Sequence, residues 1–515
     1  MRYTSQQKLA RRKRRIEKRL NPTRRWRARR CPIFTARNIR YDLADRDRGV
    51  AHGGIGAVHL LARRVGLIDA IDRDVHLLKT HLPYHESDHV LNIAYNILCD
   101  GQCLQDLETL RNDEVYLDAL GASRIPDPTT AGDFCRRFES DQQVLMLLET
   151  INQVRLGVWK QQEDKFFDRA VIDSDGTIAP TFGQCKEGMN ISYDGQWGYH
   201  PLVISLANTR EPLYLVNRSG NRPSHEQADE YLDKAINLCR KAGFKSILLR
   251  GDTDFMQTWK LDEWDRAGDV TFVFGADARK PMIGRAEALP DAAWRRLERQ
   301  PKYEVKTEPR VRPENVKEQV VKDKRFKNYV LKWEDVAEFE HRPDLCGRSY
   351  RLIVLRKKIS VEQGQERLFE EYAYFFYITN DRKNDAEQVV FTANDRCDQE
   401  NLIEQLKNGV GSMRNPLDNL HSNWAYMVMT SLAWTLKAWW GLMLPADPGR
   451  WHGRYQQERR EIVKMEFKQF VTNLMRLPCQ IVKTGRRLIY RLLNYNPWQS
   501  ALLRGVAAWR TRTQC

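Results

Sequence analysis

Three carboxylates lie in local sequences that could bring them together at one catalytic site. Asp175 follows an apolar run in VIDSDGT, and Asp252 ends the run SILLRGD. Glu400 lies in DRCDQENLIEQLKNG, between Arg396 and Lys407. Apolar runs that end on Gly and Asp are typical of buried strands that deliver an acid to the edge of a sheet. In α/β proteins that edge is where ligands bind.

The chemistry that calls for such acids is phosphoryl transfer on a nucleic-acid backbone. Two Mg²⁺ ions about 3.5 to 4 Å apart can activate the attacking oxygen and stabilise the leaving one. Mg²⁺ prefers hard oxygen ligands, whereas carboxylates packed together without a cation repel one another and raise each other's pKa. We therefore expect Asp175, Asp252 and Glu400 to hold two Mg²⁺ ions, for which Mn²⁺ can substitute.

Other interpretations of these acids stay open. Asp254 is the alternative to Asp252, although D-F-M-Q favours a helix-capping role for Asp254, with Gln257 at the capping-box position. Asp173 shares a strand face with Asp175 because side chains alternate, and it could be a solvated strand residue.

The sequence around Glu400 predicts a helix with one charged face. Arg396, Glu400, Glu404 and Lys407 follow offsets of four, four and three, which places all four on one side of a helix. Taken alone, the pattern also fits an exposed, salt-bridged face.

The overall charge indicates a polyanionic partner. The 515 residues include 84 Lys and Arg against 68 Asp and Glu, a net charge of +16. Such a surplus favours nucleic acid as the partner. Residues 1–30 hold fourteen Lys or Arg and one acid. We expect this basic arm to be disordered when free and to order on DNA phosphates, with contacts from Arg11, Arg12, Arg14, Arg24, Arg25, Trp26 and Arg27.

Several classes of protein are disfavoured. No Walker-type phosphate loop occurs, which argues against an NTP-driven enzyme. The charged start is not followed by the apolar core of a signal peptide, so we expect a cytoplasmic, nucleoid-associated bacterial protein with no membrane partner. The apolar segment 424–444 contains Lys437 and several hydroxyls, which favours a buried helix over a membrane span.

The elements that must position the acids follow from the change of hydrophobic period along the chain. Helical periodicity precedes residue 160, and three short strands after 170 are followed by alternating helix and strand. We expect an α/β fold, an RNase H-like mixed-sheet core interrupted by a β-rich insertion, with helical N- and C-terminal regions. The predicted parts are a basic DNA-binding arm (1–50), a helical DNA-binding domain (51–160), the first part of the core (165–280), the insertion (281–370), the second part of the core (371–415) and a basic helical C-terminal region (416–515).

These motifs together resemble those of bacterial insertion-sequence transposases of the DDE class, in the branch with a β-strand insertion and a Y-R-E-K signature. The resemblance extends from IPDPTTAGDF to LPCQIVKTGRRL. Arg396, Glu400 and Lys407 match the last three positions of Y-x2-R-x3-E-x6-K, whereas Ala393 occupies the Tyr position. The contact made by that Tyr in relatives must be absent or supplied elsewhere.

The resemblance implies cut-and-paste movement of DNA. Asp175, Asp252 and Glu400 would be the catalytic metal ligands, and Arg396 and Lys407 would contact DNA near the scissile phosphate. The partners implied are the terminal inverted repeats and target DNA, held by a homodimer in a synaptic complex. The apolar helix at 424–444 is the expected dimer surface. The alternatives are a nonenzymatic DNA-binding regulator and a stand-alone RNase H-like nuclease.

Overall fold

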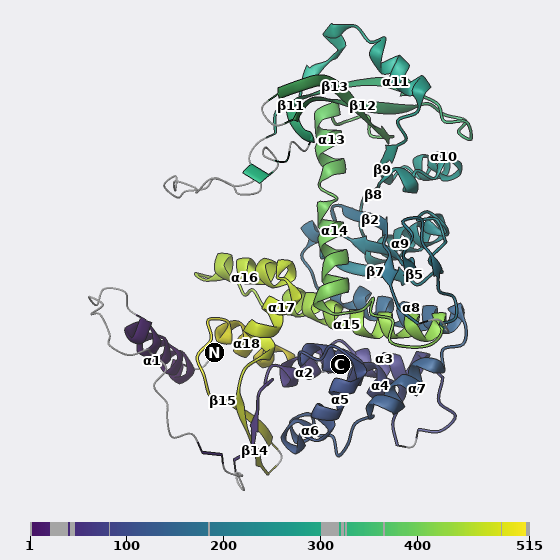
Figure 1. Ribbon diagram of the computed structural model, residues 1–515. Helices are drawn as coiled ribbons and strands as arrows, with labels where there is room; N and C mark the ends of the chain where they lie inside the picture. The colour runs from purple at the N-terminus through teal and green to yellow at the C-terminus, as the bar shows by residue number, and fades with distance from the viewer. Residues whose placement is uncertain are drawn as a thin grey trace.

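The computed structural model describes residues 3–20, 40–41, 47–81, 83–183, 186–299, 319–320, 324, 327–363, 366–485 and 487–510. Four predicted DNA contacts lie outside these residues, namely Arg24, Arg25, Trp26 and Arg27. The described part is a mixed α/β protein with one large sheet, a helical layer below it and a basic helix at the N-terminus (Figure 1).

A nine-stranded sheet is the centre of the fold. Its strand order is β10-β11-β12-β13-β9-β8-β2-β6-β7. The inner strands β2, β8 and β9 run parallel to one another, and β6, β7 and β13 are antiparallel to their neighbours. The strands from β9 to the edge strand β7 are β2 (Ala170–Gly176), β6 (Leu202–Leu206), β7 (Glu211–Val216), β8 (Ile247–Gly251) and β9 (Val270–Ala276).

Helices cover the sheet because each presents an apolar face to it. Helix α9 (Ala228–Ala242) packs on β2, β6 and β7, and its buried residues recur at three and four. Helix α10 (Thr258–Arg266) packs on β9. Helices α13 (Ala386–Asn394) and α14 (Cys397–Glu404) run nearly end to end, from the long strands down to the helical layer (Figure 1). A short π-helical turn, Gln405–Gly409, ends α14.

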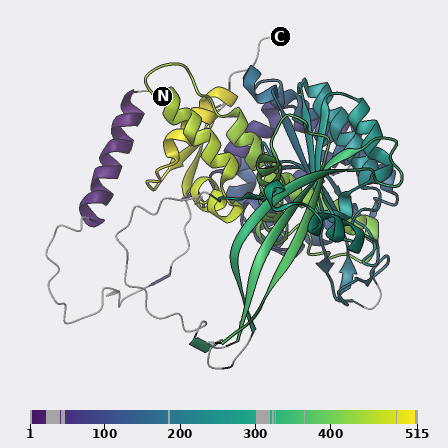
Figure 2. The same cartoon turned by 90° about the horizontal axis from the view of Figure 1, so that it is seen from above.

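The polar segment after β9 extends the same sheet. It contains α11 (Lys280–Glu287), β10 (Arg295–Arg296) and three long strands, β11 (Lys327–His341), β12 (Tyr350–Gln363) and β13 (Glu366–Thr379). Figure 2 shows the long strands projecting beyond the rest of the body. Because β13 pairs with β9, this segment joins the central sheet directly, and β13 continues past residue 370, where the predicted insertion ends.

Helices of the N-terminal half form the layer below the sheet. They are α2 (Ile55–Arg64), α3 (Leu67–Asp74), α4 (Glu86–Leu98), α5 (Leu107–Arg111), α6 (Glu114–Leu120), α7 (Pro128–Arg136) and α8 (Asp141–Trp159). Single-turn 3₁₀ helices and a small sheet of β3 (Ala179–Pro180), β4 (Asn190–Ile191) and β5 (Trp197–Tyr199) complete the connections.

Helix α15 (Leu420–Met443) is buried within the fold, as its sequence predicts. It packs against α4, α8, α16 and β7, and Trp424, Trp434, Trp439 and Trp440 are almost fully buried. Its apolar surface is therefore covered within one molecule, and its proposed role as a dimer surface is wrong. No helix among the described residues is both long and apolar enough to span a bilayer.

The C-terminal region is less helical than its sequence predicts. Helices α16 (His452–Lys464), α17 (Phe467–Phe470) and α18 (Gln499–Trp509) are present. The stretch KTGRRLIYRLL, expected to be helical, instead lies in a hairpin of β14 (Cys479–Thr484) and β15 (Arg487–Leu492), which pairs with β1 (Gly49–Val50). Gly485 sits at the turn with φ +51°, a conformation that glycine adopts without strain and that interrupts a helix.

Candidate active site

Asp175 and Asp252 lie at the same end of two adjacent parallel strands. In the register of β2 and β8, Asp173 is opposite Arg250. The two predicted ligands are each two residues further along, so they emerge on the same face of the sheet. Gly251 is required by close packing, because a Cβ there would lie 2.6 Å from Phe255 Cβ and 2.9 Å from Ser174 Oγ.

Asp252 also shapes the loop that follows β8. Its side chain accepts a hydrogen bond from the Asp254 backbone N at 3.0 Å and caps the short 3₁₀ helix Thr253–Phe255. Helix α10 begins later, after Gln257. The helix-capping role expected for Asp254 is therefore wrong: Asp252 is the capping residue, and Asp254 is exposed.

Arg396 joins the two aspartates. Its Nη1 lies 3.3 Å from Asp175 Oδ2 and 4.0 Å from Asp252 Oδ2. One guanidinium nitrogen therefore faces both carboxylates. The distance between Asp175 Oδ2 and Asp252 Oδ2 cannot exceed the sum of these two distances. The Arg396 and Asp175 side chains are 19% and 16% exposed, so this cation and anion are largely removed from water.

Helix α14 carries Glu400 near enough to Asp175 for the two charges to interact. Gln399 fixes the helix to the sheet, since its buried amide contacts the Ser205 hydroxyl and donates to the Val203 carbonyl at 3.1 Å. Glu400 is exposed in the first turn, and its charge acts on Asp175. Lys407, in the π-helical turn, is half-buried and also interacts electrostatically with Asp175.

The pKa values of both aspartates in the cluster are raised, because nearby positive charge does not fully compensate their burial. Burial raises the pKa of Asp175 to about 7; Arg396 opposes this rise, and Asp252 and Glu400 add to it. Burial also raises the pKa of Asp252, again against Arg396. The pKa of Lys407 is lowered by burial, although Glu404 and Asp175 act in the opposite direction. An additional cation near Asp175 would therefore stabilise its ionised form.

A buried ion pair between Arg250 and Asp173 links β8 to β2 two residues before the predicted ligands. Arg250 Nε and Nη2 lie 2.7 and 2.8 Å from the two Asp173 oxygens, and Arg250 Nη1 donates to the Thr392 carbonyl at 3.1 Å. Asp173 is 1% exposed, so its interpretation as a solvated residue is wrong. The sequence carried a signal for this pair, because Asp173 and Arg250 each precede a predicted ligand by two residues, on the same strand face.

The donor chemistry of the cluster fits a divalent cation. Carboxylate oxygens are the ligands that Mg²⁺ prefers. The raised pKa of Asp175 means that a nearby cation would stabilise its ionised form. Among the described residues, however, no group of three acids, histidines or cysteines is already close enough to enclose an ion. Asp175 and Asp252, which share Arg396, are the pair best placed to hold one, with Glu400 as the third carboxylate.

Three predicted DNA contacts of the arm, Arg11, Arg12 and Arg14, lie on a helix away from the acids. Helix α1 (Tyr3–Leu20) is described as folded, and it lies apart from β2 and β8 in both views (Figures 1 and 2). Arg11 and Arg14 are exposed. Arg12 instead donates to the Leu492 and Asn494 carbonyls at 3.0 and 2.8 Å, which ties α1 to the end of β15.

Ala393 lies at the signature position where the resemblance calls for Tyr. It is in the last turn of α13, partly buried against a small apolar cluster that includes Val389 and Val390. A methyl group there has no aromatic face to offer DNA.

Comparison with known proteins identifies the family. Residues 35–513 match the family model described as "Transposase DDE domain group 1". No curated protein matches the sequence. Among solved structures, a cryo-EM structure of the piggyBac transposase synaptic complex with hairpin DNA is similar at 11% identity, over 83% of this chain and 80% of that one. Its TM-score of 0.38 is too low to define the fold. Because the family model spans nearly the whole chain, the protein belongs to the DDE transposases of domain group 1.

Proposed function

We propose that this transposase excises an insertion sequence by metal-dependent cleavage at its ends and joins the freed 3′-hydroxyl to target DNA. The observation that carries the proposal is the convergence of Asp175 and Asp252 on one Arg396 nitrogen, with the Glu400 charge acting on Asp175. Acids brought so close from distant parts of the chain raise one another's pKa, and such an arrangement is most useful as a cation site.

The core of the fold supports this assignment. The five strands β7-β6-β2-β8-β9 have β2 in the middle, antiparallel to β6 and parallel to β8. This is the order expected for an RNase H-like core, with Asp175 on its first strand and Asp252 at the end of its fourth. The strands β11 and β12 then fall within the predicted insertion, and β13 runs from its end into the predicted second part of the core.

The catalytic roles follow from where each side chain lies. Asp175, Asp252 and Glu400 would hold two Mg²⁺ ions, or Mn²⁺ in their place. When bound, these ions supply charge stabilisation for the attacking and leaving oxygens of an in-line displacement. Arg396 Nη1 contacts both aspartates and offsets part of their negative charge in the free protein. With metal bound, its guanidinium is free to contact a DNA phosphate.

Two phosphodiester reactions would use this site. Water breaks the bond between phosphorus and the 3′-oxygen at the element end, which leaves a 3′-hydroxyl and a 5′-phosphate. The 3′-hydroxyl then attacks a phosphodiester of another strand, forming a new P–O bond and releasing a 3′-hydroxyl from that strand. Lys407, near Asp175 in the π-helical turn, would contact the DNA backbone beside the scissile phosphate.

The DNA partners would be the terminal inverted repeats and the target. Both ends must be processed together, so a homodimer assembled on two ends is part of the proposal, although α15 is too buried to be its surface. Sedimentation of the protein with element ends tests this, and one protomer holding two ends would contradict it.

A strand-transfer assay with precleaved element ends tests the activity. Joined product that requires Mg²⁺ or Mn²⁺ supports the proposal. Cleavage without joining would indicate a stand-alone nuclease, and neither reaction, with DNA binding intact, would indicate a nonenzymatic regulator. The variant Glu404→Gln is a suitable control for Glu400→Gln, because Glu404 lies one turn further along α14, exposed, and accepts a hydrogen bond from Asn408.

A further inference from the structure

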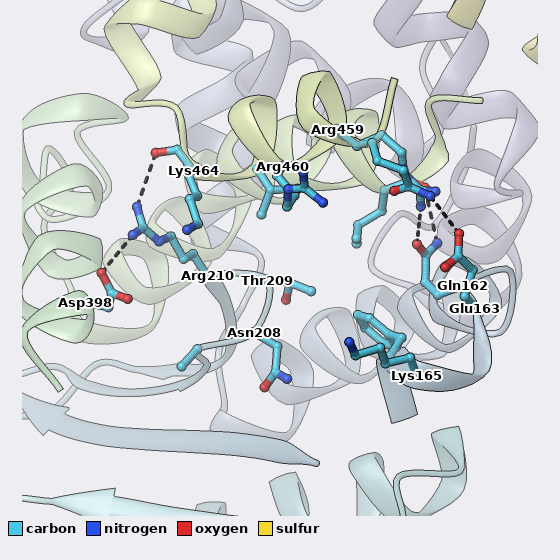
Figure 3. A pocket seen from close by; sticks show the side chains of 16 residues that line it. Gln162, Glu163, Lys165, Asn208, Thr209, Arg210, Asp398, Arg459, Arg460 and Lys464 are labelled. Atoms are coloured by element: carbon cyan, nitrogen blue, oxygen red, sulfur yellow. Dashed lines mark hydrogen bonds and ion pairs between the residues drawn. The ribbon is translucent and has the colours of Figure 1, made fainter. Parts of the chain in front are cut away.

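A cavity lined by basic side chains lies across α14 from the acidic cluster. It has a volume of 420 Å³, is open to solvent, and is lined by α16, the end of α15, the turn between β6 and β7, the segment after α8 and the start of α14 (Figure 3). Asp398 is on its wall. Asp398 and Glu400 are two residues apart on α14, so they point about 200° apart around the helix. The cavity is therefore separate from the catalytic residues.

The charges around this basic cavity do not balance. Arg210 Nη2 is paired with Asp398 at 2.8 Å, and Arg459 donates to the Leu442 carbonyl at 2.8 Å. The second acid on the wall, Glu163, accepts a hydrogen bond from Gln456. Three further cations line the cavity and form no ion pair with any residue that the structure describes: Lys165, Arg460 and Lys464. The cavity thus has more positive charge than its own carboxylates can neutralise.

A buried hydroxyl in the same wall also lacks a partner. Thr209 is 1% exposed, lines the cavity, and its Oγ1 has no hydrogen-bond partner among the residues that the structure describes. The turn that carries it is fixed, because Trp434 Nε1 donates to the Arg210 carbonyl at 2.6 Å and Arg210 Nη1 donates to the Lys464 carbonyl at 3.2 Å. A buried hydroxyl without a partner is costly, and an anionic oxygen in the cavity could accept its hydrogen bond.

Two of these cations also line a second cavity. Arg460 and Lys464 are four residues apart on α16, so they lie on one face of the helix. Both also line an adjoining cavity of 570 Å³, together with Gln457, Gln469, Trp498 and one acid, Glu461, which accepts a hydrogen bond from Gln457. The two hollows form a basic groove across α16. A groove with cations along its length fits a chain of phosphates better than a single small anion.

We propose that this basic groove binds phosphates of the DNA backbone away from the bond that is cut. The inference rests on the proposed function in so far as the protein acts on DNA. It adds a positioning surface, built from Thr209, Arg460 and Lys464, that contains none of the proposed catalytic residues. Phosphate contacts of this kind fix the register of the duplex without reading its sequence.

Salt-dependent DNA binding by the full chain tests the charged part of the groove. The double variant Arg460→Ala/Lys464→Ala should bind an element-end duplex about tenfold more weakly. The slope of log K against log salt should become shallower by about 1 to 2, since each neutralised phosphate contributes roughly 0.9. The matched control is Lys234→Ala/Lys241→Ala on α9, which removes the same charge outside the groove and should retain the wild-type slope.

The uncharged variant Thr209→Val tests the role of the hydroxyl, because it should change protein stability and DNA affinity in opposite directions. Removing an unsatisfied buried hydroxyl should raise the Tm of the free protein, whereas losing a donor to phosphate should weaken DNA binding about threefold. A residue with a purely structural role would change the Tm alone. Unchanged affinity in Thr209→Val together with an unchanged slope in Arg460→Ala/Lys464→Ala would overturn the proposal.

The same variants separate other outcomes. If pyrophosphate binds the wild type and not Arg460→Ala/Lys464→Ala, while duplex binding is equal in both, the groove takes a free phosphate compound and the DNA assignment is wrong. If the wild type neither cuts nor joins DNA but the groove variants still lose affinity, the proposed function fails and the groove assignment stands.

Discussion

Arg396 Nη1 lies 3.3 Å from Asp175 Oδ2, although 221 residues separate them in the chain. The first residue precedes helix α14, and the second is on the central strand β2. Their contact fixes the position of the Glu400 helix relative to the strand that carries the first aspartate. The Arg396 guanidinium is thereby held against both Asp175 and Asp252.

The first prediction concerns the acids themselves. Each of three variants should reduce the rates of cleavage and strand transfer by more than about 100-fold: Asp175→Asn, Asp252→Asn and Glu400→Gln. Mutating a residue that only orients a metal ligand costs up to about 100-fold, so loss of a ligand itself should cost more. DNA binding should remain. The measurement is product formation from labelled element ends in Mg²⁺. Near-wild-type rates in any of the three, or a comparable loss in Glu404→Gln, would contradict the assignment.

The second prediction is a dependence of stability on pH in the absence of divalent ions. The folded-state pKa of Asp175 is about 7, above its ordinary value of 3.8. A raised pKa means that the folded protein retains the proton longer, so this contribution is fully present below about pH 4 and is lost as pH rises through 7. The loss is at most about 4 kcal/mol. Thermal unfolding between pH 5 and 8 measures it.

The same experiment contains its own controls. Asp175→Asn should show a weaker fall in Tm with pH, because an amide does not titrate. Added Mg²⁺ or Mn²⁺ should raise the wild-type Tm more at pH 8 than at pH 5, since protons compete with metal for the carboxylate. Equal metal stabilisation of the wild type and Asp175→Asn would indicate that the ions bind elsewhere.

The third prediction concerns the buried Asp173–Arg250 pair. Arg250→Met should lower the free energy of unfolding by about 3 to 5 kcal/mol, because it leaves the Asp173 carboxylate buried without its partner. The double variant Asp173→Leu/Arg250→Met should recover much of this loss. Denaturant titration measures both values. Equal destabilisation in the single and double variants would show that the pair has no special coupling.

The fourth prediction distinguishes arginines on α1. Arg11→Ala/Arg14→Ala removes two exposed cations and should make the salt slope of DNA binding shallower by about 2. Arg12→Ala should instead release α1 from the Leu492 and Asn494 carbonyls, which limited proteolysis would detect as earlier cleavage near residue 20. Unchanged proteolysis of Arg12→Ala would contradict this anchoring role.

The sequence alone identified the residues with catalytic potential. Apolar runs that end on acids placed Asp175 and Asp252 at strand ends, and β2 and β8 do end there. Helical spacing grouped Arg396, Glu400 and Lys407, and the long apolar segment was correctly interpreted as the buried helix α15. These features are local, because they depend on periodicity over a few turns or strand residues.

Only the tertiary structure decided which groups are partners. It paired Asp173 with Arg250, and it made Asp252 the cap in place of Asp254. It also folded KTGRRLIYRLL as a hairpin and covered the surface of α15 that had suggested a dimer. Local sequence cannot supply these results, because burial and pairing depend on which distant segments pack together. Propensity is a weak bias that such packing overrides.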